Sequence, residues 1–195
     1  LSGSPSRVQK TGPSAPLFPR WVTNTGSVHV LHNSPVVSKG RVYVSVGKPN
    51  AGAPGAGVLC LRVATGEQLW KADSPHGDIR GPVSVHDGNV YAITGNGNVA
   101  AWDAETGKPI WNVPMQRDYA DGRPLAINNT PPIPTRFGLL VSDWQKPQYL
   151  LDYASGKRFS TLSGDTGYYA SFATVFDDVM YLSLIHISEP TRPQC

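Results

Sequence analysis

The stretch VAAWDAETGKPIW, residues 99–111, decides the fold of this chain. A degenerate copy, VLCLRVATGEQLW, spans residues 58–70. A shorter copy, YLLDYASGKRF, spans residues 149–159, with Phe159 for the final tryptophan and one position early. The glycine of the motif recurs at positions 66, 107 and 156, at intervals of 41 and 49 residues. A period of about 40 to 50 residues is typical of β-propeller blades, each built from four strands.

A second pattern precedes each copy of the motif and recurs once more after the last. It consists of two short β-rich runs around a turn, which predicts a hairpin. It is clearest in SPVVSKGRVYV (34–44) and GPVSVHDGNVYA (81–92), and looser in PIPTRFGLLV (132–141) and FATVFDDVMY (172–181). A hairpin followed by a motif makes four strands, so we expect about four repeat units, counting partial ones at each end.

Composition excludes the other fold classes. The 195 residues include 20 glycines and 18 prolines, and prolines at this density exclude helical bundles and coiled coils because each interior proline breaks a helix. Five Trp, eight Tyr and five Phe supply apolar surface to bury, which excludes disorder throughout. The sequence therefore predicts an all-β fold: an incomplete β-propeller forming an open arc of about four four-stranded blades, with partial end blades. Such an arc exposes edges and faces that a closed ring would cover.

The motif has a physical basis in the turn between its two strands. Asp103 and Asp152 stand where a carboxylate can accept turn N–H groups, whereas Arg62 replaces the acid in the first copy. The following glycine permits positive φ, and a tryptophan four residues later would bury about 200 Å² against the next blade. We therefore expect structural roles for the following motif residues: Thr65, Gly66, Trp70, Asp103, Thr106, Gly107, Trp111, Asp152 and Gly156.

The pattern Ala-x-Asp-Ala-x-Thr-Gly-Lys-x-x-Trp, complete at residues 101–111, resembles the repeat of pyrroloquinoline-quinone-type (PQQ-like) β-propellers. The resemblance covers roughly residues 18–181. It implies the propeller fold but not the quinone, because most proteins with this repeat are not quinone enzymes. A narrower resemblance, in residues 1–21, the hairpin at 34–44 and SDWQ at 142–145, is to the propeller half of bacterial calcineurin-like metallophosphoesterases. In that family a catalytic domain precedes the propeller, and none of its metal-binding motifs occurs in this chain.

Charge and cysteine content exclude several classes of partner. The net charge is +3 with scattered basic residues, which argues against nucleic-acid binding. Cys60 and Cys195 cannot build a disulfide framework, and no Cys/His cluster has zinc spacing. No apolar run approaches the roughly 20 residues of a transmembrane segment, and the pattern of these residues predicts no signal peptide among them.

The two ends of the chain are expected to lie outside the propeller. Residues 1–17 are predicted to be an extended leader or linker, followed by the partial propeller at 18–181. Residues 182–195, LSLIHISEPTRPQC, resemble the translation of an adapter used to prepare DNA sequencing libraries. We expect this tail to be non-native, so that His186 and Cys195 carry no functional weight.

Candidate ligand-facing residues fall in three loops. His76, Asp78 and Arg80 mix an imidazole, a carboxylate and a guanidinium before a strand, and turn chemistry is the alternative interpretation. Asn128 and Asn129 lie in the longest insertion, between Trp111 and Pro132, for which an ordinary solvated connection is the alternative. The third candidate is Trp144. Beside Asp143 it could imitate a cofactor site, but one acid with one aromatic residue is a common pair.

Two functions remain open. The first is a non-catalytic PQQ-like propeller module for binding or scaffolding, part of a larger envelope or secreted bacterial protein, with a protein or ligand partner on its loops. The sequence shows no Ser-His-Asp arrangement, and we expect no metal site. No cofactor is expected outside the alternative below, its binding residues stay unknown, and a metallophosphoesterase parent stays open. The alternative is part of a quinoprotein dehydrogenase that uses PQQ and Ca²⁺. The resemblance implies a periplasmic or secreted location.

Overall fold

A computed structural model describes the greater part of the chain: residues 18–26, 34–47, 55–74, 79, 81–94, 97–115, 131–142, 148–162, 170–176 and 179–184. Fourteen strands lie in these residues, in three four-stranded sheets and one two-stranded sheet. Within each sheet, strands that follow one another in the sequence pair antiparallel. Each four-stranded sheet is therefore a simple meander. The described residues contain no helix that could span a membrane.

Each sheet corresponds to one predicted repeat unit. The strands of the first sheet are β1 (Val36–Ser38), β2 (Arg41–Val46), β3 (Gly57–Arg62) and β4 (Gln68–Asp73). Those of the second are β5 (Ser84–His86), β6 (Asn89–Ile93), β7 (Asn98–Asp103) and β8 (Pro109–Pro114). Those of the third are β9 (Ile133–Thr135), β10 (Gly138–Ser142), β11 (Gln148–Leu151) and β12 (Arg158–Leu162). The last sheet contains β13 (Ala170–Phe176) and β14 (Val179–Leu184).

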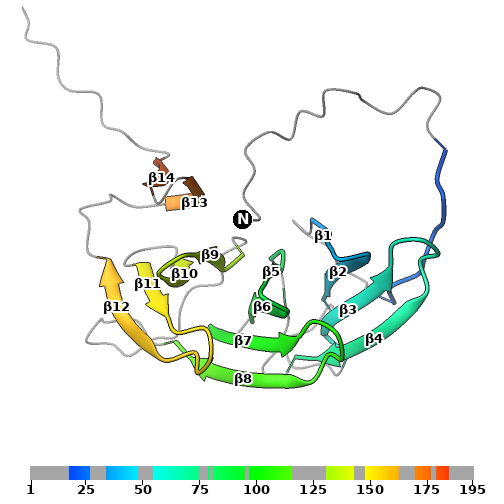
Figure 1. Ribbon diagram of the computed structural model, residues 1–195, viewed down its shortest axis with the longest axis horizontal. Coiled ribbons are helices and arrows are strands. Elements are labelled where there is room, and N and C mark those ends of the chain that lie inside the picture. The colour runs from blue at the N-terminus through cyan, green and yellow to red at the C-terminus, as the bar shows by residue number, and fades with distance from the viewer. Residues whose placement is uncertain are drawn as a thin grey trace, which may run out of the picture.

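The sheets stand side by side around a common centre and leave the circle open (Figure 1). Their first strands lie innermost: β5 contacts both β1 and β9, and β9 also contacts β13. The prediction of an all-β, incomplete propeller is thereby confirmed. We call the three complete sheets blades 1, 2 and 3.

Strand β14 extends past the predicted start of the non-native tail. Leu182, Ser183 and Leu184 pair with Ala173, Phe172 and Ala170 of β13. The backbone of these three residues can therefore complete a strand, whatever their origin. The adapter origin of residues 182–195 stays a prediction that the underlying DNA sequence tests.

Alternation of side chains along each strand builds the core between blades. In β2 and β3, for example, Tyr43 and Cys60 face blade 2, whereas Val42 and Leu59 face the opposite side. One buried cluster joins blades 1 and 2, and its members include Tyr43, Val58, Cys60, Val83, Val90 and Trp102. A second joins blades 2 and 3, and its members include Tyr91, Val99, Leu139, Val141, Tyr149 and Leu151.

A register shift recurs between the third and fourth strands of every blade, and it corrects the alignment of the third motif. The shift falls after Cys60, Ala101 and Leu150. Trp70 lies opposite Cys60 and Trp111 lies opposite Ala101, but Ser160 lies opposite Leu150. Phe159 therefore occupies the bulged position before the tryptophan position and does not replace the tryptophan.

Candidate functional site: the turn rim between blades

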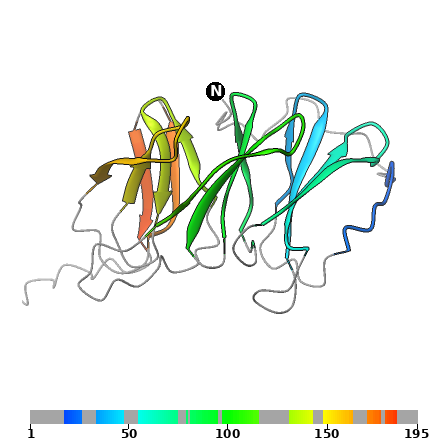
Figure 2. The same ribbon diagram turned by 90° about the horizontal axis from the view of Figure 1, so that it is seen from below.

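Two sets of turns gather at one end of the blades. In an antiparallel meander the first and third turns of a sheet lie at the same end, and Figure 2 shows them together. Backbone hydrogen bonds join the two sets, from Val63 N–H to Gly40 O (3.0 Å) and from Ala104 N–H to Gly88 O (2.7 Å). We call these turns, residues 38–41, 62–68, 86–89, 103–109, 135–138 and 152–158, the turn rim.

The three outer turns of the rim share one backbone geometry. The N–H groups of Gly66, Gly107 and Gly156 each donate to the carbonyl four residues earlier at 2.8 Å. The three glycines have φ of 72°, 72° and 70°, a left-handed conformation that side chains other than glycine rarely adopt.

A carboxylate caps two of these turns. Asp103 Oδ1 accepts hydrogen bonds from the Thr106 hydroxyl (2.6 Å) and the Thr106 N–H (2.7 Å). Asp152 Oδ1 accepts the corresponding pair from Ser155 (2.6 and 2.9 Å). Hydrogen bonds from these hydroxyls, and then from the backbone, lower the pKa of both carboxyls. In the first copy Arg62 forms an ion pair with Glu67 instead (2.9 Å).

A tryptophan from one blade lies on the glycine turn of the next. Trp70 donates its indole N–H to Ala104 O at 3.2 Å, and Trp111 donates to Tyr153 O at 2.9 Å. A Cβ atom added to Gly107 would lie 2.6 Å from Cε3 of Trp70, and one added to Gly156 would lie 2.6 Å from Cε3 of Trp111. These positions therefore exclude a side chain sterically as well as by φ. We call this arrangement the tryptophan lock.

Trp21 forms a third lock that the sequence analysis did not identify. Its indole N–H donates to Val63 O at 2.8 Å, and a Cβ atom on Gly66 would lie 2.5 Å from its Cε3. Thr23 adds a hydrogen bond from its hydroxyl to Gly66 O at 2.7 Å. No glycine motif directly precedes Trp21, so the local repeat pattern does not include it. The available signal was its distance of 49 residues from Trp70, within the range of the repeat period.

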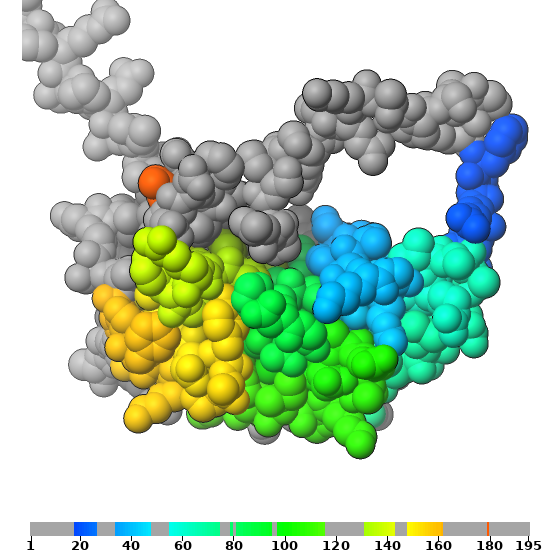
Figure 3. All heavy atoms as spheres, viewed as in Figure 1, coloured from blue at the N-terminus to red at the C-terminus, as the bar shows by residue number. Residues whose placement is uncertain are grey.

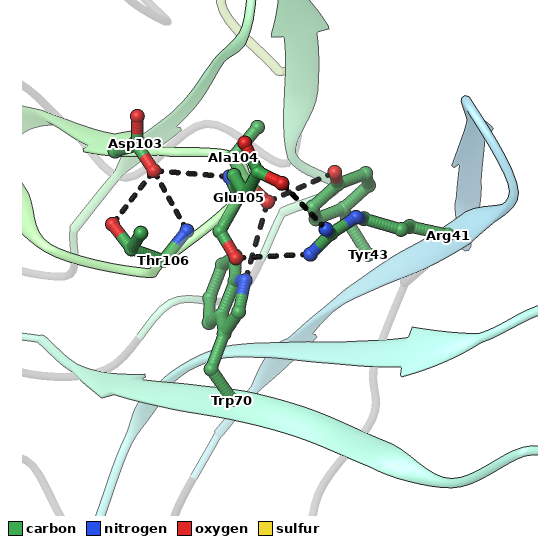
Figure 4. A network of polar contacts seen from close by, with 7 residues as sticks. All are labelled: Arg41, Tyr43, Trp70, Asp103, Ala104, Glu105 and Thr106. Carbon is green, nitrogen blue, oxygen red and sulfur yellow. Dashed lines mark hydrogen bonds and ion pairs between the residues drawn. The ribbon is translucent and has the colours of Figure 1, made fainter.

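In addition to the tryptophan lock, polar side-chain contacts connect blades 1 and 2 (Figure 4). Arg41 donates to the Glu105 carbonyl at 2.9 Å and lies 3.4 Å from the Glu105 carboxylate. Tyr43 donates its hydroxyl to Ala104 O at 3.1 Å. Burial raises the pKa of Tyr43 to about 12, so the hydroxyl remains a donor at neutral pH.

At the junction of blades 2 and 3, aromatic rings from the two blades contact each other on the turn rim. His86 stacks on Tyr153, with ring centroids 4.8 Å apart and planes at 28°, and Tyr91 lies 5.9 Å from Tyr153. Within blade 3, the Tyr153 hydroxyl accepts from Thr135 N–H (2.8 Å) and lies 2.7 Å from Thr135 O and 3.0 Å from Gly138 O. Burial raises the pKa of Tyr153 to about 12.

The motif residues thus meet on the rim, whereas the structure does not test the predicted ligand-facing residues. His76, Asp78, Arg80, Asn128, Asn129 and Trp144 all lie outside the described residues. Within the described part of the chain no group of three or more His, Cys, Asp or Glu side chains could hold a metal ion.

Fold and rim together define a β-propeller of the PQQ-like repeat class. The family described as outer membrane protein assembly factor BamB matches residues 18–113 and 54–130, which together cover more than half of the chain. The chain belongs to this family.

Two curated BamB proteins are similar to it. One from Alkalilimnicola ehrlichii is 42% identical over 64 residues, and one from Burkholderia pseudomallei is 30% identical over 89 residues. These matches cover 31% and 40% of this chain but only 16% and 23% of the relatives' lengths. A 1-butanol dehydrogenase (cytochrome c) from Thauera butanivorans is 29% identical over 121 residues, 57% of this chain and 16% of that enzyme.

Solved structures agree on the fold. BamB from Moraxella catarrhalis superposes with a TM-score of 0.59 at 18% identity, covering 84% of this chain and 46% of that one. The computationally designed Ika4 protein gives a TM-score of 0.61 at 14% identity, covering 80% of this chain and 88% of that one. The predicted PQQ-like repeat is confirmed. The expected closeness to metallophosphoesterases finds no support among these relatives, which are BamB proteins and a butanol dehydrogenase.

Proposed function

We propose that this chain is part of a non-catalytic envelope propeller that binds or scaffolds other proteins, as the name of its assembly-factor relatives suggests. The observation that carries the proposal is the BamB family match over residues 18–130. The curated relatives extend far beyond this match, so the proposal concerns a parent protein of which the chain is one part.

The geometry of the rim supports this function. The motif side chains are engaged in turn caps and tryptophan locks, which makes the rim a stiff support for exposed groups. At the β9–β10 turn the Arg136 guanidinium lies 4.5 Å from the centroid of the Phe137 ring, and Phe137 is 57% exposed. Arginine and aromatic residues are enriched in protein interfaces. We propose the β9–β10 turn as a place of partner contact.

A deletion of the parent gene tests the function in the cell. Loss of a BamB-type factor should lower the amount of folded outer-membrane protein, measured by heat-modifiable mobility in gels of isolated outer membranes. Complementation with Phe137→Ala should restore less than wild type, and Val179→Ala, at another exposed apolar position, serves as the matched control. Normal outer-membrane protein levels in the deletion strain would contradict the assembly role.

The second candidate, part of a quinoprotein dehydrogenase, rests on the match to the butanol dehydrogenase, which covers more of this chain than either BamB match. Titration of the purified parent protein with PQQ and Ca²⁺, followed by tryptophan fluorescence, distinguishes the two. Tight binding with dye-linked oxidation of an alcohol would establish the dehydrogenase and exclude the non-catalytic scaffold. The envelope location is common to both proposals, and cell fractionation of the parent protein tests it.

A further inference from the structure

We propose that the turn between β5 and β6, at Asp87 and Gly88, is a site of spontaneous isoaspartate formation. In this reaction the Gly88 amide nitrogen bonds to Cγ of the protonated Asp87 carboxyl, and the amide proton and the carboxyl hydroxyl leave together as water. Water then opens the resulting succinimide ring at one of its two C–N bonds. One opening regenerates aspartate, and the other leaves isoaspartate, whose Cβ atom lies in the main chain. This modification does not depend on the proposed function.

The attacking nitrogen of Gly88 is unhindered. Among the described residues its N–H donates no hydrogen bond, whereas the Gly88 carbonyl accepts one from Ala104 N–H at 2.7 Å. No atom lies within 4 Å of a Cβ atom built on Gly88. Because glycine has no side chain of its own, the nitrogen can approach the preceding side chain freely.

The Asp87 carboxyl group is open to attack and to water. Its side chain is 87% exposed, and its Oδ2 atom lies 3.3 Å from Nε2 of His86. In Figure 3 green atoms of blade 2 lie at the exposed surface between blue atoms of blade 1 and yellow atoms of blade 3. Solvent can therefore reach this hairpin and open the ring.

The backbone of the turn already has half of the conformation that the ring requires. Asp87 has φ of 44°, a positive value that is uncommon for a residue other than glycine. Ring closure on an L-residue sets its ψ to about −120°, and positive φ with this ψ describes the first central residue of a type II′ turn. Gly88, now at φ of 79°, can adopt φ of either sign. The ring form thus fits β5 and β6 as a two-residue hairpin turn.

The two other acidic turns of the rim lack these properties. Asp103 and Asp152 each accept hydrogen bonds from a hydroxyl and an N–H group, which lower their pKa and so deplete the protonated form that loses water. The residues that follow them, Ala104 and Tyr153, carry side chains that crowd the attacking nitrogen. We therefore expect isoaspartate at Asp87 and not at these two positions.

The corresponding turn of blade 1 has the same backbone but cannot react. Lys39 and Gly40 have φ of 46° and 75°, and no atom lies within 4 Å of a Cβ atom built on Gly40. Lysine has no carboxyl group for the glycine nitrogen to attack. Asp87→Lys therefore removes the reaction while it installs a pair of residues that this fold already accepts in the same turn.

Isoaspartate would disturb contacts that the turn makes on the rim. The additional backbone atom falls between His86, which stacks on Tyr153, and Gly88, which accepts the hydrogen bond from Ala104 N–H. We expect the Ala104 amide of the isoaspartyl form to exchange with solvent faster than that of the unmodified chain, because its acceptor is displaced. Asp87→Lys aged in the same way is the control and should show no change at this amide. Unchanged exchange in the isoaspartyl form would overturn this consequence.

Ageing of the full chain tests the site. The folded protein is kept at neutral pH for several weeks and digested with endoproteinase Asp-N, which cleaves before aspartate but not before isoaspartate. We expect the uncleaved peptide 78–102 to accumulate at least about tenfold above peptides left uncleaved before Asp103 or Asp152. Electron-transfer fragmentation locates the modified residue and separates it from the other Asp-Gly pair, residues 121–122, which lies outside the described residues. No isoaspartate at Asp87 above the level at Asp103 and Asp152 would overturn the proposal.

Ala104→Gly separates the geometry of the turn from the dipeptide itself. The variant creates a second Asp-Gly pair at residues 103–104, where the attacking nitrogen is bonded to Gly88 O and the Asp103 carboxylate is held by Thr106. Because those hydrogen bonds must break first, we expect residue 103 of this variant to stay at least about tenfold below residue 87. Equal isoaspartate at the two positions would show that the dipeptide alone decides, and would overturn the assignment to the β5–β6 turn.

Discussion

The two junctions between complete blades share one contact and differ in another. Both are closed by a tryptophan on a glycine turn, in almost superposable geometry. Besides this contact, an ion pair between Arg41 and Glu105 joins blades 1 and 2, whereas the His86 ring stacked on Tyr153 joins blades 2 and 3. The difference follows from several rim positions. Arg41 and Glu105 correspond to Asn89 and Ala154, and Ser38 and Ala104 correspond to His86 and Tyr153. The repeat therefore specifies the shared lock, and single substitutions at the rim specify each junction.

Removing the lock should have the largest effect, and it should be similar at the two junctions. Trp70→Ala and Trp111→Ala each leave a cavity against the next blade and remove the indole donor to a carbonyl group there. Ala104 O keeps its hydrogen bond from Tyr43. We expect each to lower the free energy of unfolding by about 3 kcal/mol, measured by urea denaturation. A loss below about 1 kcal/mol at either site would show that the lock does not hold that junction.

The lock also depends on the space above the turn glycine. Gly107→Ala introduces a side chain at positive φ and against the Trp70 ring, so we expect a loss of about 2 kcal/mol. Gly88 is the matched control, because it has φ of 79° and no atom within 4 Å of an added Cβ atom. Gly88→Ala should cost about 1 kcal/mol, from backbone strain alone. Equal losses would mean that contact with the ring contributes nothing.

The third prediction compares a tyrosine hydroxyl that bonds within blade 3 with one that bonds across the junction of blades 1 and 2. Tyr153→Phe removes the hydroxyl that accepts from Thr135 N–H, and we expect a loss of about 1 kcal/mol. Tyr43→Phe should cost less, because Ala104 O keeps its hydrogen bond from Trp70. Calorimetric melting of both variants measures the difference. A larger loss for Tyr43→Phe would show that the hydroxyl across the junction contributes more stability than the one within blade 3.

The ion pair at the first junction should contribute little. The Glu105 side chain is 81% exposed and Arg41 25%, so a double-mutant cycle of Arg41→Met and Glu105→Gln should give a coupling below about 0.5 kcal/mol. The coupling should vanish in 1 M salt, where the Debye length is about 3 Å. The exposed pair of Arg62 and Glu67 lies within one turn and is the control. A salt-independent coupling would indicate a desolvated pair.

The smallest effect concerns pH. Hydrogen bonds in the folded turn lower the pKa of Asp103, so its contribution is present above the unfolded pKa of 3.8 and is lost as the pH falls through the lower folded pKa. Unfolding of wild type and Asp103→Asn, compared from pH 5 down to pH 2, should therefore converge at the acid end. A constant difference across this range would assign the effect of the variant to something other than ionisation.

Much of the architecture could be predicted from the sequence because its determinants are local. A glycine at positive φ, an acid three residues before a Thr or Ser and a tryptophan four residues after the glycine can all be recognised in one short window. The β-strand periodicity on either side predicted the blades, and the period predicted the propeller. These features depend on neighbours in the chain and need no tertiary information.

Contacts across blades could not be predicted in the same way. Whether Phe159 or Ser160 takes the tryptophan position depends on a bulge whose register is set by pairing with Leu150 and Leu151. The role of Trp21 depends on Gly66, 45 positions away, and no local motif signals it. The stack of His86 on Tyr153 joins residues from two sheets. The sequence by itself therefore determined the repeat, its strands and its turns, because short-range sterics and hydrogen bonds encode them. Only the tertiary structure decided which side chains meet between blades, because that depends on register and on burial against the next sheet.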